Sequence, residues 1–452
     1  MDQLFPYQNE GASFLADKRL AMLADEMGLG KSVQAIRGLD SVHAHNVLIV
    51  CPSIARINWL REFEKWALLK RRYTVLTGLR DPVPRSGAAI CSFEYATENM
   101  ISLKRFKWDA VVLDEAHYLK SHETKRSKAV LGKDGLIHSA SRTWFLTGTP
   151  APNDPSELWV FLRVAGQTKL TYEQFVERYC KVTKTSYGLK IHGANGHRIP
   201  ELRQLLSTIM LRRLKKDVMT QLPPLFYSKL NVEPGLVDLE IQSAFTEYFH
   251  PIERRKDLFD ELNAQKKLLQ DVVDNSVGVE GRLLAIKSIA TSVSSLRKYN
   301  GLQKVDPAIE YVHWQFKQKS FSKLVIFCVH RDVIEGLRIG LKKYRPQIVY
   351  GGTPPGKRQT RIDRFQKEPT AKVFIGNIRA AGIAVNLTSA HDVLFVEQDW
   401  VPGNNAQAVM RCHRIGQKNS VNVRTMVIDG TLDAQIDFIL ARKTKDLTEI
   451  FD

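Results

Sequence analysis

The sequence has few cysteines and no long hydrophobic run. Its five cysteines are widely separated, odd in number and without the paired spacing of a zinc site, so a disulfide framework is excluded and reduced intracellular thiols are favoured. No apolar run approaches the length of a membrane span, and the chain is polar within two residues of its start. Neither membrane insertion nor secretion is therefore indicated. Internal repeats and long low-complexity tracts are also missing.

The sequence also has fewer acidic than basic residues. The 452 residues include 66 Lys and Arg against 48 Asp and Glu, which gives a formal net charge of +18. Clustered cations gain affinity for a phosphate backbone by releasing its counterions, so this balance favours a nucleic acid as partner. A merely solvated basic surface is the alternative. The length exceeds one compact core and predicts two main domains, each large enough to bury a parallel sheet.

A glycine-containing loop near the N-terminus is the first local signal. Residues 20–24 are an apolar run typical of a buried strand, and residues 33–39 have the pattern of a helix start. Between them lies Asp-Glu-Met-Gly-Leu-Gly-Lys-Ser, from Asp25 to Ser32. Strand, glycine loop and helix in this order predict a phosphate-binding loop, although Asp25 stands where the usual pattern has glycine. A glycine turn followed by an ordinary surface lysine is the alternative.

Each residue of this loop has an expected role. The backbone from Gly28 through Leu29 to Gly30 can bend so that successive amides point at phosphate oxygens. Lys31 can then reach the β and γ phosphates, and Ser32 can hold Mg²⁺ at the positive end of the following helix.

Other polar residues flank the predicted strands of the first half. Gln8 lies upstream of the loop and can pair with two edge groups of adenine, although a surface glutamine is the alternative. After a second apolar run at residues 47–50, Ser53 and Arg56 are candidate contacts to nucleic-acid phosphates, but Ser53 can equally be a helix cap.

A pair of carboxylates follows a third apolar run, residues 110–113. At the end of a buried strand a carboxylate is costly to desolvate unless it meets a cation, so we expect Asp114 to bind the Mg²⁺ held by Ser32. Glu115 can then orient or deprotonate the attacking water. An acidic pair at a helix start is the alternative.

Two further segments of the first half are candidates for coupling and for DNA binding. A strand at residues 143–146 leads into Thr147-Gly148-Thr149-Pro150, whose small hydroxyl side chains can sense a nucleotide, with a plain turn as the alternative. Helical patterns cover residues 172–179 and 201–217, with a basic loop or small hairpin between them at 184–198. The second pattern contains candidate DNA contacts or, alternatively, a solvated helix face: Arg212, Arg213 and Lys215.

The second half repeats the alternation of strand and helix patterns, which predicts another α/β domain. Its apolar runs are residues 323–327, 347–349, 372–375 and 393–396. A helix-like segment from Gln407 to Gln417 contains Arg411 and Arg414, three residues apart and hence on one face. Two guanidinium groups presented together can neutralise charge developing on a transferring γ-phosphoryl group. A surface arginine pair is the alternative.

These motifs together resemble the Swi/Snf family of superfamily 2 helicase-like, DNA-dependent ATPases. The residues that show the resemblance are Tyr7-Gln8, Asp25 to Ser32, Asp114 to His117, Leu146 to Pro150, Ala380 to Thr388 and Gln407 to Gln417. Asp25 is normal in that family. The chain departs from the family at Ala384, where a second glycine is common, and at Val401, where asparagine usually follows the tryptophan. Within the family it looks most similar to the compact annealing-helicase branch, the HARP-like proteins.

The resemblance implies an α/β fold with two tandem RecA-like domains, each a parallel sheet flanked by helices. Residues 1–225 would form the ATP-binding lobe, with a helical and basic insertion at about 166–222. Residues 226–292 would form a helical protrusion and residues 293–452 the second lobe. The resemblance further implies a coupling role for His117, Thr147, Gly148 and Thr149, a place in the nucleotide site for Gly382 and Gln407, and a DNA contact for Trp400.

The function implied is that of a motor using ATP and Mg²⁺ to move along double-stranded or branched DNA, held mainly by the phosphate backbone. Such a motor would remodel forks or branches, anneal strands or displace bound protein. A true strand-unwinding DNA or RNA helicase, and a non-catalytic nucleic-acid-binding scaffold, are the alternatives. The expected location is the cytoplasm or nucleoid of a prokaryote or, for a virus-encoded protein, the host cytoplasm.

Overall fold

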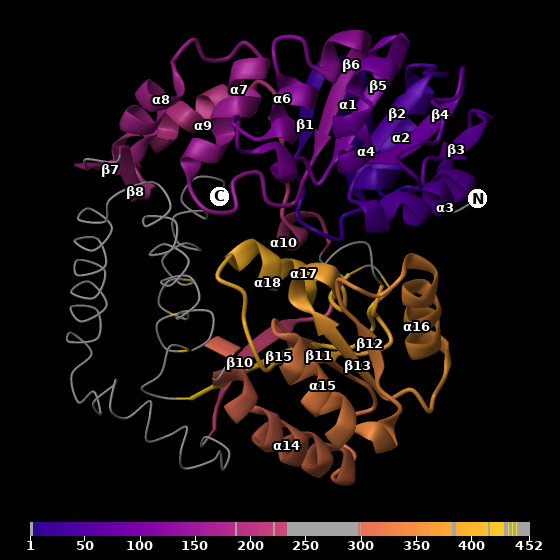
Figure 1. The fold of residues 1–452 in the computed structure, drawn as a ribbon, viewed down its shortest axis with the longest axis vertical. Coiled ribbons are helices and arrows are strands. Elements are labelled where there is room, and N and C mark those ends of the chain that lie inside the picture. Colours follow the sequence, from indigo (N-terminus) through magenta and orange to yellow (C-terminus); the bar gives the residue numbers. More distant parts are fainter. Residues whose placement is uncertain are drawn as a thin grey trace, which may run out of the picture.

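The computed structural model describes residues 3–185, 188–219, 222–232, 297–298, 300–381, 386–414 and 416–428, together with 433, 436 and 440. Two lobes, each built on a parallel sheet, stand one above the other (Figure 1). The predicted α/β class is therefore confirmed. The predicted protrusion lies, from residue 233 onward, outside the described residues. Within the described ranges, no helix is both long enough and apolar enough to span a membrane.

The sheet of the first lobe has seven strands in the order β3-β4-β2-β5-β6-β1-β9. All neighbouring strands are parallel, so their carboxyl ends share one edge of the sheet. The strands are β1 (Leu20–Leu23), β2 (Val47–Cys51), β3 (Tyr73–Val75), β4 (Ala88–Ser92), β5 (Trp108–Asp114), β6 (Ala140–Leu146) and β9 (Met210–Leu211).

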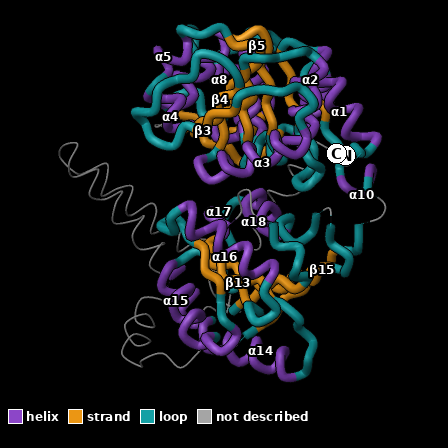
Figure 2. The backbone as a smooth tube through the Cα atoms, turned by 90° about the vertical axis from the view of Figure 1, so that its right-hand side faces the viewer, coloured by secondary structure: helices purple, strands orange, loops and turns teal. Residues whose placement is uncertain are grey.

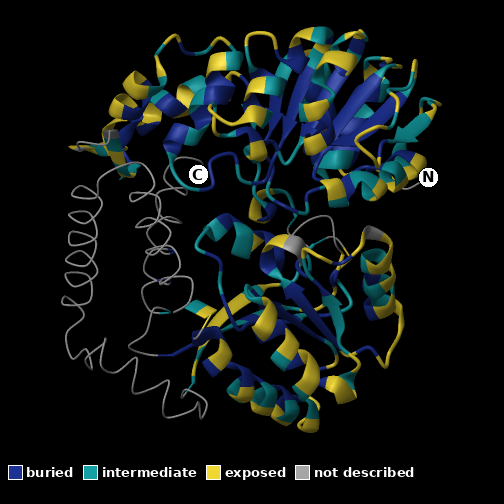
Figure 3. Ribbon diagram, viewed as in Figure 1, coloured by how far each residue is buried: buried dark blue, intermediate teal, exposed yellow. Residues whose placement is uncertain are grey.

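Helices cover both faces of this sheet, which explains why its central strands are continuous apolar runs. In β2, Leu48 and Val50 belong to the core on one face, and Val47 and Ile49 to the core on the other. Figure 3 shows the strands buried and the outer helix surfaces exposed. The helices of the lobe proper are α1 (Pro6–Asp17), α2 (Lys31–Ser41), α3 (Arg56–Trp66), α4 (Phe93–Glu98), α5 (Met100–Lys104), α6 (Lys125–Leu131) and α10 (Lys215–Val218).

The insertion before the end of the lobe has a small core of its own, to which Phe175, Tyr179 and Leu202 contribute. The predicted hairpin is present, but it begins earlier than expected. The helical prediction for 201–217 is confirmed over residues 201–207 and again at 215–217, but it is wrong between them, because residues 210–211 pair with β1 as an edge strand. The elements of the insertion are α7 (Trp159–Val164), α8 (Tyr172–Tyr179), β7 (Cys180–Thr185), β8 (Gly188–Ala194) and α9 (Ile199–Ser207).

The sheet of the second lobe has six parallel strands in the order β10-β15-β14-β11-β13-β12. They are β10 (Leu225–Asn231), β11 (Leu324–Cys328), β12 (Gln347–Val349), β13 (Val373–Asn377), β14 (Asp392–Phe395) and β15 (Val421–Val427). The helices are α14 (Val305–Lys317), α15 (Arg331–Gly340), α16 (Pro355–Lys367), α17 (Ile378–Ala381) and α18 (Pro402–Val409).

Strand β10 belongs to the sheet of the second lobe, whereas the predicted domain boundaries place residues 226–231 in the protrusion. It is an edge strand whose side chains are largely exposed, including Phe226 at 56% and Tyr227 at 65%, so it lacks the apolar run of a buried strand. The connection between the lobes is thereby short. In two perpendicular views, α17 and α18 lie at the end of the second lobe that faces the first (Figures 1 and 2).

Candidate nucleotide site between the lobes

The glycine loop follows β1 and leads directly into α2, as predicted. Gly28 and Gly30 have φ angles of 92° and 76°, a left-handed conformation that is strained for residues with a side chain. The ammonium of Lys31 donates a hydrogen bond of 2.8 Å to the carbonyl oxygen of Asp25, across the mouth of the loop. Burial lowers the pKa of Lys31, and carboxylates including Glu115 oppose that shift. The loop is a cradle with a cation at the start of a helix, the arrangement that phosphate groups require.

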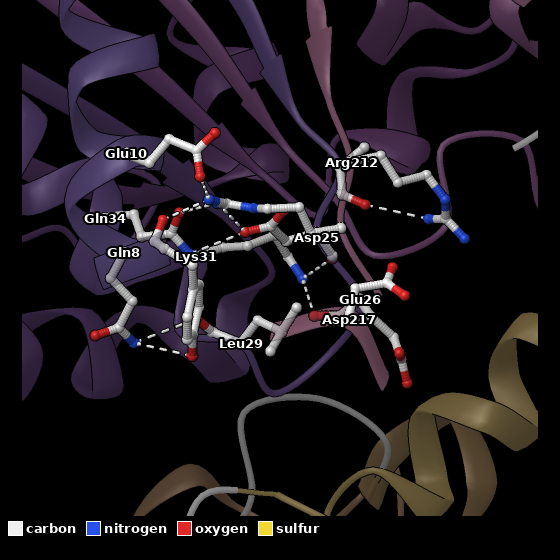
Figure 4. A network of polar contacts seen from close by, with 12 residues as sticks. Gln8, Glu10, Asp25, Glu26, Leu29, Lys31, Gln34, Arg212 and Asp217 are labelled. Atoms are coloured by element: carbon white, nitrogen blue, oxygen red, sulfur yellow. Dashed lines mark hydrogen bonds and ion pairs between the residues drawn. The ribbon is translucent and has the colours of Figure 1, made fainter. Parts of the chain in front are cut away.

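Asp25 anchors the loop through a buried ion pair. Its two carboxylate oxygens accept hydrogen bonds of 3.0 and 2.7 Å from the guanidinium of Arg213, and one also accepts from Gln34 at 3.0 Å. Glu10 lies 3.0 Å from the same guanidinium, and Figure 4 shows Glu10, Gln34 and Asp25 turned toward a common centre. The prediction that Arg213 contacts DNA is therefore wrong: the guanidinium is fully used inside the lobe.

Two other predicted residues also contact the phosphate loop rather than solvent. The side-chain amide of Gln8 donates to the carbonyl of Leu29 at 3.3 Å, and a β-carbon at Gly30 would lie 2.6 Å from that amide. One guanidinium nitrogen of Arg212 donates to the carbonyl of Ala24 at 3.1 Å, so this arginine contacts the residue that directly precedes the loop.

Asp114 ends strand β5 and is deeply desolvated. Burial raises its pKa to about 7, and the neighbouring Glu115 charge adds to the shift, while a hydrogen bond from Trp59 and the charge of Lys31 oppose it. The Trp59 indole donates to one carboxylate oxygen at 2.8 Å, which fixes the orientation of the side chain. A carboxylate held in this way next to a lysine fits a divalent cation, which would offset the desolvation.

Glu115 occupies a strained backbone position and links the two lobes. Its φ of 52° is uncommon for a residue with a side chain. One carboxylate oxygen accepts a 2.9 Å hydrogen bond from Gln407 on α18 of the second lobe. The other makes no hydrogen bond within the described residues and lies 3.4 Å from Nδ1 of His117. This unpaired buried oxygen suits a group that must accept a proton from, or orient, a bound water.

The predicted coupling residues form a continuous path to the second lobe. Nδ1 of His117 lies 3.2 Å from the hydroxyl of Thr147, which accepts a 3.1 Å hydrogen bond from the amide of Thr149. A β-carbon at Gly403, in the first turn of α18, would lie 3.0 Å from Thr149, so only glycine permits this approach without a shift. Burial lowers the pKa of His117 to about 3, which keeps the imidazole neutral at neutral pH. Gly148 sits inside this path, since a β-carbon there would meet both Met27 and the ammonium of Lys31.

The arginine pair of the second lobe reaches the phosphate loop. A β-carbon at Gly28 would lie 3.3 Å from Cβ of Arg414, and the charge of Arg411 contributes to the lowered pKa of Lys31. Burial, followed by the charge of Arg414, lowers the pKa of Arg411 to about 10, so it remains a cation at neutral pH. The helical prediction for this segment is wrong in part: α18 ends at Val409, and both arginines follow in a turn.

The other residues that were predicted to contact DNA or nucleotide lie in several different surroundings. Ser53 is exposed and lines a cavity of about 280 Å³ between the lobes. Arg56 donates from its guanidinium to the carbonyls of Leu76 and Thr77, at 2.5 and 3.1 Å, and so braces the first lobe. The ring of Trp400 lies 5.2 Å below the guanidinium of Arg297. Gly382 lies outside the described residues.

Three cationic residues lie between the lobes, but the sequence analysis either did not identify them or predicted a different role for them. Arg358 and Arg379 of the second lobe line the same cavity as Ser53, and the side chain of Arg379 is 70% exposed although its guanidinium pairs with Asp399. Lys215 was expected on DNA, yet its side chain is only 6% exposed and contacts the second lobe. Arg379 directly precedes the Ala380 to Thr388 motif, and that neighbourhood was the one signal that could have identified it.

The fold and the site define a two-lobed protein of the RecA-like helicase class, with a phosphate loop on one lobe and an arginine pair on the other. Residues 7–247 match the family model described as the SNF2-related domain, and residues 303–416 match the helicase conserved C-terminal domain. The chain therefore belongs to the SNF2-related family, which confirms the resemblance seen in its motifs.

Several individual proteins are similar to this chain. The chain is similar to the DNA annealing helicase and endonuclease ZRANB3 of Bos taurus. The two are 31% identical over an alignment of 462 residues, gaps included, which covers 98% of this chain and 40% of the relative. It is also similar to the SWI/SNF-related matrix-associated actin-dependent regulator of chromatin subfamily A-like protein 1 homolog of Caenorhabditis elegans, with 28% identity covering 96% and 60%. The chain thus spans about half the length of these two relatives. Among solved structures, the Sulfolobus solfataricus SWI2/SNF2 ATPase core in complex with dsDNA matches with a TM-score of 0.45 and 25% identity, covering 99% of this chain and 93% of that one.

Proposed function

We propose that this chain is an ATP-dependent translocase on double-stranded DNA that hydrolyses ATP between its two lobes. The observation that supports this most strongly is the meeting of Lys31 and Glu115 of the first lobe with Gln407 and Arg411 of the second at one place. A nucleotide bound in the phosphate loop would touch both lobes, so hydrolysis would be linked to their closing and opening. Remodelling of forks or branches, strand annealing and displacement of bound protein are the activities that such movement would serve.

The side chains divide the chemistry among them. The loop amides and Lys31 would hold the β and γ phosphates, and Ser32 with Asp114 would hold Mg²⁺, which neutralises charge on the phosphate oxygens. Glu115 would orient the attacking water and accept its proton. Arg411 and Arg414 would stabilise the charge that develops on the transferring phosphoryl group, an effect that contributes about a thousandfold to a hundred-thousandfold in rate in comparable enzymes.

The cavity between the lobes is the place where we expect the DNA backbone. Ser53 lines it from the first lobe and Arg358 and Arg379 from the second, so a phosphate there would contact both lobes at once. Contacts of this kind grip the backbone and give little sequence preference. The net charge of +18 agrees with a polyanionic partner.

Three measurements test the proposal. Steady-state ATP hydrolysis should rise with duplex or forked DNA and less with RNA, and equal rates without nucleic acid would reject a DNA-dependent motor. Duplex affinity should fall about a thousandfold or more between 50 and 200 mM salt if six or more phosphates are contacted, whereas a flat salt response would reject backbone tracking. Strand-displacement activity on a forked duplex would favour the unwinding helicase instead.

A further inference from the structure

The segment that follows β9 runs from the phosphate loop to the second lobe, and we call it the connector (residues 212–219 and 222–224). At its start it continues alongside the loop, because the amide of Glu26 donates to the carbonyl of Arg213 at 2.9 Å. At its end the amide of Val421 donates to the carbonyl of Pro224 at 2.9 Å, where the chain enters the sheet of the second lobe. The connector therefore touches both halves of the proposed ATP site.

Lys215 lies in the middle of the connector and is almost completely buried, with 6% of its side chain exposed. Its backbone amide donates a 2.7 Å hydrogen bond to the carboxylate of Glu26 in the phosphate loop. Its ammonium donates a 2.6 Å hydrogen bond to the carbonyl of His413 in the second lobe and contacts the sulfur of Met410. The ammonium also lies 3.9 Å from the carboxylate of Glu26, so this one residue binds both lobes.

The carbonyl that Lys215 binds belongs to the turn that presents the arginine pair. His413 immediately precedes Arg414, and its imidazole is held by a 2.8 Å hydrogen bond from Nε2 to the carbonyl of Pro223, also in the connector. A β-carbon at Gly28 would lie 3.3 Å from both the ammonium of Lys215 and Cβ of Arg414. The connector, the arginine turn and the phosphate loop therefore pack against one another at Gly28.

Burying the ammonium of Lys215 between the lobes costs free energy, so stability alone does not explain why a lysine occupies this position. Burial lowers the pKa of Lys215 to about 7, Glu26 opposes that shift, and the nearby cations Arg414, Lys31 and Arg411 add to it. An apolar residue would avoid this cost. A donor that fixes the backbone of the arginine turn gives the lysine a function that an apolar residue would not fulfil.

We propose that Lys215 is a positioning residue of the ATPase reaction: by holding the His413 carbonyl against the phosphate loop, it sets the place of Arg411 and Arg414 during phosphoryl transfer. This inference rests on the proposed function. Lys215 acts through the arginine turn and is not itself expected to bind the nucleotide. It therefore affects the rate of the chemical step and not the affinity for ATP.

The test compares Lys215→Met, which keeps the apolar stem and removes the donor, with Lys216→Met, the exposed neighbour on α10. ATP hydrolysis at saturating duplex DNA gives kcat, and the fluorescence of a labelled ATP analogue gives the dissociation constant. Lys215→Met should lose about a hundredfold in kcat with unchanged affinity, because a displacement near 1 Å costs that much. Lys216→Met should behave as the wild type. If Lys215→Met does not fold, Lys215→Gln is one bond shorter than lysine and should show the same loss.

A combined variant separates positioning from a general structural role. Lys215→Met added to a chain that carries both Arg411→Ala and Arg414→Ala should slow hydrolysis no further than the two arginine substitutions alone, because the lysine acts through both arginines. Full additivity, a matching loss of nucleotide affinity, or a wild-type kcat for Lys215→Met would each overturn the inference. A wild-type chain that hydrolyses no ATP would instead reject the proposed function, and the inference with it.

Discussion

The side-chain amide of Gln407 in the second lobe donates a 2.9 Å hydrogen bond to the carboxylate of Glu115 in the first. The two residues are 292 positions apart in the sequence. Glu115 pairs with only one of its two oxygens in this way, and the other remains without a hydrogen bond within the described part of the chain. The contact between the lobes therefore orients the carboxylate while leaving one oxygen for a water.

Glu115→Gln should bind ATP as the wild type does and lose about a hundred- to ten-thousandfold in turnover. The amide keeps the size and the hydrogen-bonding reach of the side chain but cannot accept a proton from water. Binding of a labelled ATP analogue and steady-state hydrolysis with duplex DNA check the two halves of this prediction. Undiminished hydrolysis would remove Glu115 from the mechanism.

Gln407→Ala should lower kcat by roughly ten- to hundredfold, since a hydrogen bond to a charged group contributes about 1.5–3 kcal/mol. The Michaelis constant for ATP should change little, because the amide acts by orienting Glu115. Kinetics over a range of ATP concentrations distinguish the two effects. A raised Michaelis constant with unchanged kcat would show that Gln407 binds the nucleotide directly.

Arg213→Ala should destabilise the first lobe by about 3–5 kcal/mol, because it leaves the fully buried carboxylate of Asp25 without its cation. Chemical denaturation measures this loss, with Lys216→Ala on the exposed side of the connector as the control. The salt dependence of duplex binding should stay the same for protein that remains folded. A stable variant with a reduced salt slope would restore the DNA contact that the sequence suggested.

The stability of the wild type relative to Lys215→Met should rise with pH above about 7. Lys215 has a pKa of about 7 in the folded protein against 10.5 in the unfolded chain, so the unfolded state binds one more proton between those values. The advantage should grow by up to about 1.4 kcal/mol per pH unit in that window. Denaturation at pH 7, 8 and 9 checks it, and a difference that is flat or falls would contradict the buried position of Lys215.

Much of this architecture could be predicted from the sequence, because buried strands of parallel sheets are continuous apolar runs. The runs at 47–50, 110–113 and 347–349 all lie within strands of the structure. Two edge strands were not predicted, because β9 has only two residues and β10 is largely exposed, whereas the run at 347–349 identified β12 at the other edge of the second sheet.

The site residues could be recognised where they form a short motif in the sequence. They were misassigned where their role depends on a partner that is distant in the sequence. The phosphate loop and the Asp114-Glu115 pair follow strands directly. A basic run such as Arg212 to Lys215 gives no indication of whether its charges face solvent or the interior. Here Arg213 meets Asp25, 188 residues away, and Lys215 meets His413, 198 residues away.

The central claim is that both lobes act on one bound ATP. It is tested most directly by comparing ATP hydrolysis by Arg411→Ala and Lys31→Ala at saturating duplex DNA. Arg411→Ala should retain the binding of a labelled ATP analogue and lose about a thousandfold or more in kcat, while Lys31→Ala should lose both. Turnover by Arg411→Ala equal to that of the wild type would mean that the first lobe hydrolyses ATP without the second.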